Sequence, residues 1–218
     1  MTNLSLEYLE NGIKVYQDDN LYKFTCDAVK LAKFCKLKTT DNMLDLCAGC
    51  GVVGFYAYAL HKCSKIYFNE IQSPMCELID KSIKLNNLQD RCKTLNKDLN
   101  LLHPSDFDKP LDVIVCNPPY FKLNGKVKGA ECLAICRHEI KTNLQQIVEK
   151  ASKLIKEQGR FYLIIPTDRI CETIVTFNKN GFEVKNMQIY HSQQRATVCL
   201  LEGVKSGRSG VNVKILNE

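Results

Sequence analysis

Four consecutive residues, Asn117-Pro118-Pro119-Tyr120, bring together groups that can hold a planar amine. Asn117 Oδ1 and the Pro118 carbonyl can each accept one N–H, and Tyr120 can stack on a ring face. The two prolines fix φ, so the backbone carbonyls point in set directions. The apolar run Leu111–Cys116 predicts a buried parallel strand just before them, and open α/β sheets bind ligands at that end of a strand. An ordinary Pro-Pro turn after a core strand explains these four residues equally well.

A glycine-rich segment upstream favours a ligand site. Residues 43–47 predict a short strand, and residues 48–54 contain G-x-G-x-x-G before an apolar helix expected at 55–60. Glycines allow tight turns and close approach of a ligand, and a helix N-terminus presents unpaired N–H groups. The next expected strand, Lys65–Glu70, ends in a carboxylate that can accept ribose hydroxyls. These features predict a nucleotide-type cofactor and are still compatible with a dehydrogenase.

Asp45 distinguishes between nucleotide cofactors. It lies four residues before Gly49 and is expected to face the loop, where a carboxylate suits a cationic amino group better than a pyrophosphate. S-Adenosylmethionine carries such an amino group and no phosphate. At these residues the chain resembles class I methyltransferases, because residues 45–51 resemble their first motif. Residues 117–120 resemble the target-amine motif of adenine-N6 and related amino methyltransferases.

The resemblance extends over nearly the whole chain and narrows to one bacterial subgroup. Residues 25–29, 137–139 and 159–161 resemble valine-tRNA (adenine-N6)-methyltransferases, which modify the adenosine 3′ of the anticodon. The resemblance implies S-adenosyl-L-methionine as cofactor and the anticodon loop of a tRNA as partner. It also implies a Rossmann-like, doubly wound α/β sheet of seven strands with an antiparallel C-terminal strand. Cys50 departs from the pattern, because small or polar residues are commoner between the two glycines.

The same resemblance implies roles for particular residues. The expected catalytic residues are Asn117, Pro118 and Tyr120. The residues expected to bind the cofactor follow the strand ends: Asp45, Cys47, Gly49, Gly51, Glu70, Ile71, Asp98, Leu99 and Asn117. The residues expected to bind substrate are Tyr120, Phe121, Lys122, Arg137 and His138. Asp98 is expected to accept the adenine amine of the cofactor, with a helix or turn cap as the alternative.

The substrate residues have competing interpretations. Tyr120 and Phe121 are expected to stack on an adenine turned out of an RNA loop. The basic segment 122–129 suits phosphate contacts, although a solvated surface loop is nearly as compatible. Arg137 and His138 are expected to contact RNA or to order the loop, with a surface ion-pair cluster as the alternative.

Composition is consistent with a compact soluble enzyme. A chain of 218 residues with 45% hydrophobic content can bury one α/β core, so residues 1–218 are expected to form a single domain. Residues 1–40 are expected to form an N-terminal hairpin and helix that pack on the cofactor site. Thirty Lys and Arg residues against 24 acids give a net charge of +6, the sign that attracts a phosphate backbone. Without a leader pattern or a membrane-length apolar run, we expect a cytoplasmic protein. We also expect it to be a monomer or weak homodimer.

Twelve cysteines are expected to act mainly as small hydrophobic residues. Cys47 and Cys50 have the C-x-x-C spacing of a redox pair or half a zinc site, but no second C-x-x-C accompanies them. Cys132, Cys136 and His138 cluster in sequence without an evident fourth ligand. We therefore expect no bound metal.

Periodicity predicts the remaining elements of a doubly wound sheet. Helices are expected at residues 27–36, 73–85, 143–157 and 168–179, and strands at 94–98 and 160–165. Residues 182–190 and 196–202 predict an antiparallel hairpin that closes the sheet. The Gly- and Ser-containing segment 204–210 is expected to be flexible and solvated, and Lys30, Lys33 and Lys36 are expected to form a solvated helix face. Contact with RNA is the alternative for both.

Three other functions are compatible with the motifs. A protein-glutamine N5-methyltransferase acting on release factors would use the Asn-Pro-Pro-Tyr segment on a side-chain amide. A DNA adenine methyltransferase would usually need a target-recognition region, for which 218 residues leave little room. A non-enzymatic dinucleotide-binding module would bind NAD and would not need Asn117.

Overall fold

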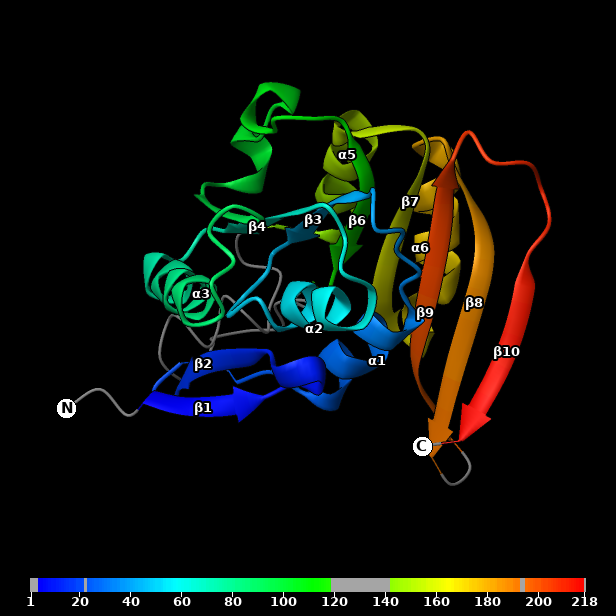
Figure 1. Ribbon diagram of the computed structural model, residues 1–218. Coiled ribbons are helices and arrows are strands. Elements are labelled where there is room, and N and C mark those ends of the chain that lie inside the picture. Colours follow the sequence, from blue (N-terminus) through cyan, green and yellow to red (C-terminus); the bar gives the residue numbers. More distant parts are fainter. Residues whose placement is uncertain (1–3, 22, 119–141, 193–194, 218) are drawn as a thin grey trace.

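In the computed structural model, which describes residues 4–21, 23–118, 142–192 and 195–217, a mostly parallel sheet forms the centre of the molecule (Figure 1). Its strands are β3 (Asn42–Leu46), β4 (Lys65–Glu70), β5 (Cys92–Asn96), β6 (Leu111–Cys116), β7 (Ile155–Pro166), β8 (Phe182–Ser192), β9 (Arg195–Lys205) and β10 (Asn212–Asn217). Their order is β10-β8-β9-β7-β6-β3-β4-β5, and only β9 is antiparallel to its neighbours. The predicted α/β fold with an antiparallel strand near the C-terminus is confirmed, but the sheet has eight strands instead of seven.

Helices cover both faces of the sheet. Helices α1 (Cys26–Phe34), α2 (Val52–His61) and α3 (Ser73–Leu85) lie on one side, and α5 (Leu144–Leu154) and α6 (Ile170–Lys179) lie on the other (Figure 1). A hydrophobic core lies on each face of the sheet, and successive strand residues point into opposite cores. Met43 packs with α1–α3, whereas Leu44 packs with α5 and α6. Because the central strands are buried on both faces, they appear in the sequence as continuous apolar runs.

An N-terminal hairpin lies against the α2 and α3 side of the molecule (Figure 1). Its strands β1 (Leu4–Tyr8) and β2 (Lys14–Asp18) pair antiparallel. The Tyr16 N–H donates to Ser82 Oγ at 2.9 Å, and Asn11 Nδ2 donates to the Ala59 carbonyl at 2.8 Å. Gln17 Oε1 accepts the Phe24 N–H at 3.2 Å, so the hairpin also fixes the start of α1.

The C-terminal segment differs from the sequence-based expectation. Residues 204–210, expected to be flexible, begin inside β9 and continue into an ordered turn. Lys185 Nζ donates to the carbonyls of Arg208 and Gly210 at 2.9 and 2.6 Å. The chain then forms β10 parallel to β8, so the β8–β9 hairpin does not close the sheet. Val213 and Ile215 of this edge strand are 48% and 69% exposed, which explains why a short, weakly buried run was missed.

Other element boundaries shift by a few residues. Strand β5 begins and ends two residues before the predicted 94–98. Asp98 therefore lies beyond the strand and caps the short 3-10 helix η2 (Leu99–Leu101). Helix α6 starts at Ile170 because a separate 3-10 turn, Thr167–Arg169, precedes it.

Gly54 offers a test of packing between α2 and the sheet. A Cβ at this position would lie 2.4 Å from Phe68 Cε1 and 3.0 Å from Asp45 Oδ2. Alanine gains about 1 kcal/mol in a helix, but overpacking a core costs about 1–3 kcal/mol. We expect Gly54→Ala to lower the free energy of unfolding in urea titrations. Combining it with Phe68→Leu should cost less than the sum of the two single changes, and strict additivity would contradict the proposed clash.

Candidate functional site

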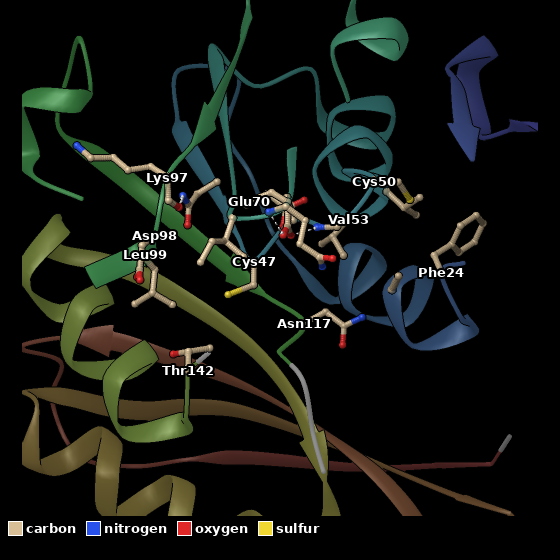
Figure 2. Close-up of a pocket in the computed structure, with 18 residues that line it drawn as sticks. Phe24, Cys47, Cys50, Val53, Glu70, Lys97, Asp98, Leu99, Asn117 and Thr142 are labelled. Atoms are coloured by element: carbon tan, nitrogen blue, oxygen red, sulfur yellow. Dashed lines mark hydrogen bonds between the residues drawn. The ribbon is translucent and has the colours of Figure 1, made fainter. Parts of the chain in front are cut away.

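A cavity opens at the carboxyl ends of β3, β4 and β6 and beside the loop after β5 (Figure 2). Its empty volume is about 910 Å³, including the part open to solvent. Strand β3 is followed in the chain by β4 and β5, which lie on one side of it in the sheet. The next strand, β6, lies on the other side of β3, so the strand order reverses here. This reversal is the point at which open α/β sheets bind ligands.

Asp45 links β3 to the start of α2. Its Oδ2 accepts the Gly54 N–H at 2.8 Å, and its side chain is only 1% exposed while lining the cavity. Burial raises the pKa of the Asp45 carboxyl to about 8; the Gly54 N–H opposes this shift and the charge of Glu70 adds to it. A cationic group in the cavity would favour the charged carboxylate.

The loop between β3 and α2 turns sharply. Cys47, Gly49 and Gly51 have φ values of 60°, 57° and 82°, which lie in the left-handed region. The Ala48 N–H donates to the Asn69 carbonyl at 2.9 Å and anchors the loop to β4. Cys47 and Gly49 line the cavity. Gly51 caps α2 and faces the core instead, since a Cβ there would lie 3.0 Å from Phe55 Cε2.

Glu70 joins the same loop to the end of β4. Its Oε2 accepts the Gly49 N–H at 2.9 Å, and its Oε1 accepts the Gln72 N–H at 2.9 Å. Burial raises the pKa of the Glu70 carboxyl, and the backbone N–H groups limit the shift. Each carboxylate oxygen can accept more than one hydrogen bond, so the side chain can hold the loop and still accept ligand hydroxyls.

Asp98 and Leu99 line the cavity from the loop after β5, and Ile71 lines it after β4. Asp98 Oδ1 accepts the Asn100 N–H at 2.8 Å and its side-chain amide at 3.1 Å. The alternative interpretation of Asp98 as a turn cap is therefore correct. Both bonds use Oδ1, so capping and ligand binding are compatible at this residue.

Asn117 lines the cavity directly after β6 and is labelled near Cys47 in Figure 2. The register pairs Leu46 with Cys116, so the loops after β3 and β6 start side by side. Pro118 is buried and is not among the lining residues. The predicted residues Tyr120, Phe121, Lys122, Arg137 and His138 lie outside the described residues, as does the segment 122–129.

Several lining residues were missed by the sequence analysis. Phe24 and Ala28 come from the start of α1, Lys97 from the loop after β5, and Thr142 from the segment before α5. Ala28 lies within the segment 25–29 that carries the resemblance, but no motif marks Phe24, Lys97 or Thr142. Their placement depends on contacts between distant segments, such as the bond from Phe24 to Gln17.

The cysteines in the described ranges are free thiols. Cys116 and Cys199 are buried in the core as expected, and Cys47 is half-buried. Burial raises the pKa of Cys50 to about 12, which disfavours a reactive thiolate. Within the described residues, no group of three or more His, Cys, Asp or Glu side chains could hold a metal ion. Cys132, Cys136 and His138 lie outside that part.

No described helix is long and apolar enough to cross a membrane.

The predicted lysine face on α1 is partly paired. Lys30 Nζ lies 3.8 Å from Asp27 Oδ1 and 4.8 Å from the Tyr190 ring centroid. Lys33 Nζ lies 3.5 Å from Glu10 Oε1. These two cations therefore contact neighbouring segments of the protein.

A mostly parallel sheet, a glycine-rich loop bonded to an acidic strand end, and an asparagine on the adjacent strand define a methyltransferase-type α/β fold. Residues 28–191 match the family model described as methyltransferase small domain, so the chain belongs to that family. The predicted methyltransferase fold is thereby confirmed.

Relatives and solved structures agree with this assignment. A protein of a Flavobacteriaceae bacterium (strain 3519-10) is 24% identical over 70% of this chain and 63% of its own length. A protein of Phocaeicola vulgatus is 25% identical over 82% and 74%. Both are named tRNA1(Val) (adenine(37)-N6)-methyltransferase. The chain thus spans less than two thirds of the first relative.

Among solved structures, Trm5 from Methanocaldococcus jannaschii in complex with adenosine has a TM-score of 0.69 at 20% identity, covering 95% of this chain and 58% of that one. A predicted O-methyltransferase from Agrobacterium tumefaciens has a TM-score of 0.67 at 20% identity, covering 87% and 85%. These similarities show the shared fold.

The raised pKa of Asp45 predicts a pH-dependent stability. The pKa of Asp45 in the folded protein, about 8, exceeds the ordinary aspartate value of 3.8, so between these two pH values the folded protein binds a proton that the unfolded chain has lost. This contribution to stability is complete below about pH 4 and is lost as pH rises through 8. Asp45→Asn keeps an acceptor for the Gly54 N–H but does not titrate. We expect the free energy of unfolding to fall less between pH 5 and 8 in the variant, as measured by urea denaturation. Parallel pH profiles would contradict the burial effect.

Proposed function

We propose that this protein is an S-adenosyl-L-methionine-dependent tRNA (adenine-N6)-methyltransferase that modifies adenosine 37 of a valine tRNA. The observation that carries the proposal is the arrangement of Asp45, Glu70 and Asn117 around one cavity at the switch point of the sheet. The proposed substrate, adenosine 37 of a valine tRNA, is the one that the names of the bacterial relatives give. The net charge of +6 has the sign that favours RNA.

The residues of the cavity fit S-adenosylmethionine. Asp45 provides a buried carboxyl whose charged form the amino group would favour, and Glu70 provides acceptors for the ribose hydroxyls. Asp98 and Leu99 provide a polar acceptor and an apolar surface for the adenine. When bound, the cofactor supplies an activated methyl group on its sulfonium sulfur.

Asn117 and Pro118 act mainly by positioning the attacking amine. Asn117 Oδ1 and the Pro118 carbonyl would accept its two N–H groups and orient the nitrogen toward the methyl group that the cofactor supplies. These acceptors also stabilise the positive charge that develops on the nitrogen. The proton becomes acidic after transfer and leaves to water, so no strong general base is needed.

The remaining substrate contacts come from the segment after β6. Tyr120 and Phe121 stack on the target adenine, and Lys122, Arg137 and His138 contact the anticodon loop. An adenine in a single-stranded loop costs least to turn out of its stack, which suits this site. We propose further that residues 1–218 act as one domain in the cytoplasm, as a monomer or weak homodimer, with residues 1–40 packed on the cofactor site.

A methyl-transfer assay tests the function. Labelled S-adenosylmethionine should transfer its methyl group to unmodified valine tRNA, and nucleoside digestion should yield N6-methyladenosine. Replacing adenosine 37 by guanosine should abolish the product. Labelling of a release factor without labelling of tRNA would favour the glutamine methyltransferase. Binding of NAD without binding of S-adenosylhomocysteine would favour the dinucleotide-binding module.

Two substitutions separate catalysis from cofactor binding. Asn117→Ala should reduce kcat on the order of 100-fold or more, because it removes an acceptor from the developing charge, while the affinity for S-adenosylhomocysteine changes little. Asp45→Ala should lose cofactor binding itself. Asn178→Ala, an exposed asparagine on α6, serves as the control and should resemble wild type. Full activity of Asn117→Ala would overturn the mechanism.

A further inference from the structure

Thr142 places a hydroxyl in the wall of the cavity that has no hydrogen-bond partner in the part of the chain that the structure describes. Its side chain is only 8% exposed, and it lines the same cavity as Asn117 and Leu99. Its Oγ1 has no hydrogen-bond partner among the described residues. A buried polar atom without a partner destabilises a protein, so such a group in a ligand cavity points to a bond made with the ligand.

Helix capping does not account for this hydroxyl. The next residue, Asn143, caps α5: its Oδ1 accepts the Gln146 N–H at 3.0 Å, and Gln146 Oε1 accepts the Asn143 N–H at 3.1 Å. This reciprocal pair satisfies the start of the helix without Thr142. The fold therefore leaves the Thr142 hydroxyl available to the cavity.

The position of α5 shows which end of the cavity Thr142 faces. Lys150 Nζ donates to the carbonyls of Asn100 and Leu102 at 2.9 and 3.0 Å, which ties α5 to the η2 segment. Leu144 and Leu99 belong to the same buried core. Figure 2 shows Thr142 on the Leu99 side of the cavity, with Glu70 farther away in this view. Thr142 thus faces the end assigned to the adenine.

We infer that Thr142 Oγ1 donates a hydrogen bond to a ring nitrogen of the adenine of S-adenosylmethionine. This inference depends on the proposed function, because it takes S-adenosylmethionine as the cofactor. Asp98 is assigned to the exocyclic amine and Glu70 to the ribose, which leaves the ring nitrogens as acceptors for a hydroxyl. Thr142 is accordingly a cofactor-binding residue that adds to the selectivity for adenine.

Calorimetric titration with S-adenosylhomocysteine tests the bond. Thr142→Val removes the hydroxyl at nearly constant shape and should weaken binding about 3- to 10-fold, whereas Thr142→Ser should stay close to wild type. Thr167→Val, which removes a hydroxyl bonded to the Ala196 carbonyl, should bind as wild type does.

Stability without ligand distinguishes this role from a structural one. Because Thr142→Val removes a buried hydroxyl that bonds to none of the described residues, the urea midpoint of the unliganded variant should equal or exceed that of wild type. A lower midpoint together with unchanged affinity would assign the hydroxyl to the fold and overturn the inference.

Analogues identify the atom that accepts the bond. The 1-deaza, 3-deaza and 7-deaza analogues of S-adenosylhomocysteine each lack one of the three ring nitrogens that can accept a hydrogen bond. Wild type should lose affinity for one of them, and Thr142→Val should show no further loss for that analogue. Equal losses in both proteins, or an effect of Thr142→Val only on the KM for tRNA, would overturn the inference. Failure of wild type to bind S-adenosylhomocysteine would refute the proposed function instead.

Discussion

The hydrogen bond from the Gly54 N–H to the buried Asp45 carboxylate is the contact on which the site depends. It fixes the first turn of α2 against the end of β3 at 2.8 Å, where the space beside Phe68 admits no larger residue than glycine. The loop between them must then turn through left-handed conformations, and this turn brings the Gly49 N–H to Glu70. One buried contact thus sets the shape of the cavity wall.

The sheet topology supplies the other half of the site. Strands β3 and β6 are distant in sequence but adjacent and parallel, with Leu46 opposite Cys116. The glycine-rich loop after β3 and the Asn117 segment after β6, which lie far apart in the chain, therefore begin at the same level of the sheet. Helices on both faces bury these strands and leave their carboxyl ends as the open edge. The asparagine and the glycine-rich loop meet because of strand register, without any direct contact being required between them.

Features that depend on neighbouring residues in the sequence could be predicted, whereas features that depend on contacts between distant segments could not. The glycine spacing and the apolar run of β6 are local, and they identified Asp45, Glu70 and Asn117 as residues that line the cavity. Strand β10 was missed because its residues gain little burial and depend on pairing with β8. Phe24 and Thr142 were missed because distant contacts, from the hairpin and from the η2 segment, place them.

The single antiparallel strand has a consequence for the order of folding. Strands β8 and β9 are joined by a short connection, so their pairing closes only a small loop and is entropically inexpensive. Pairing of β3 with β6 encloses α2, β4, α3 and β5 and requires a much longer loop to close. Contacts between distant segments form slowly in general. The C-terminal half of the sheet can therefore nucleate locally, while the binding cavity assembles late, when β6 docks beside β3.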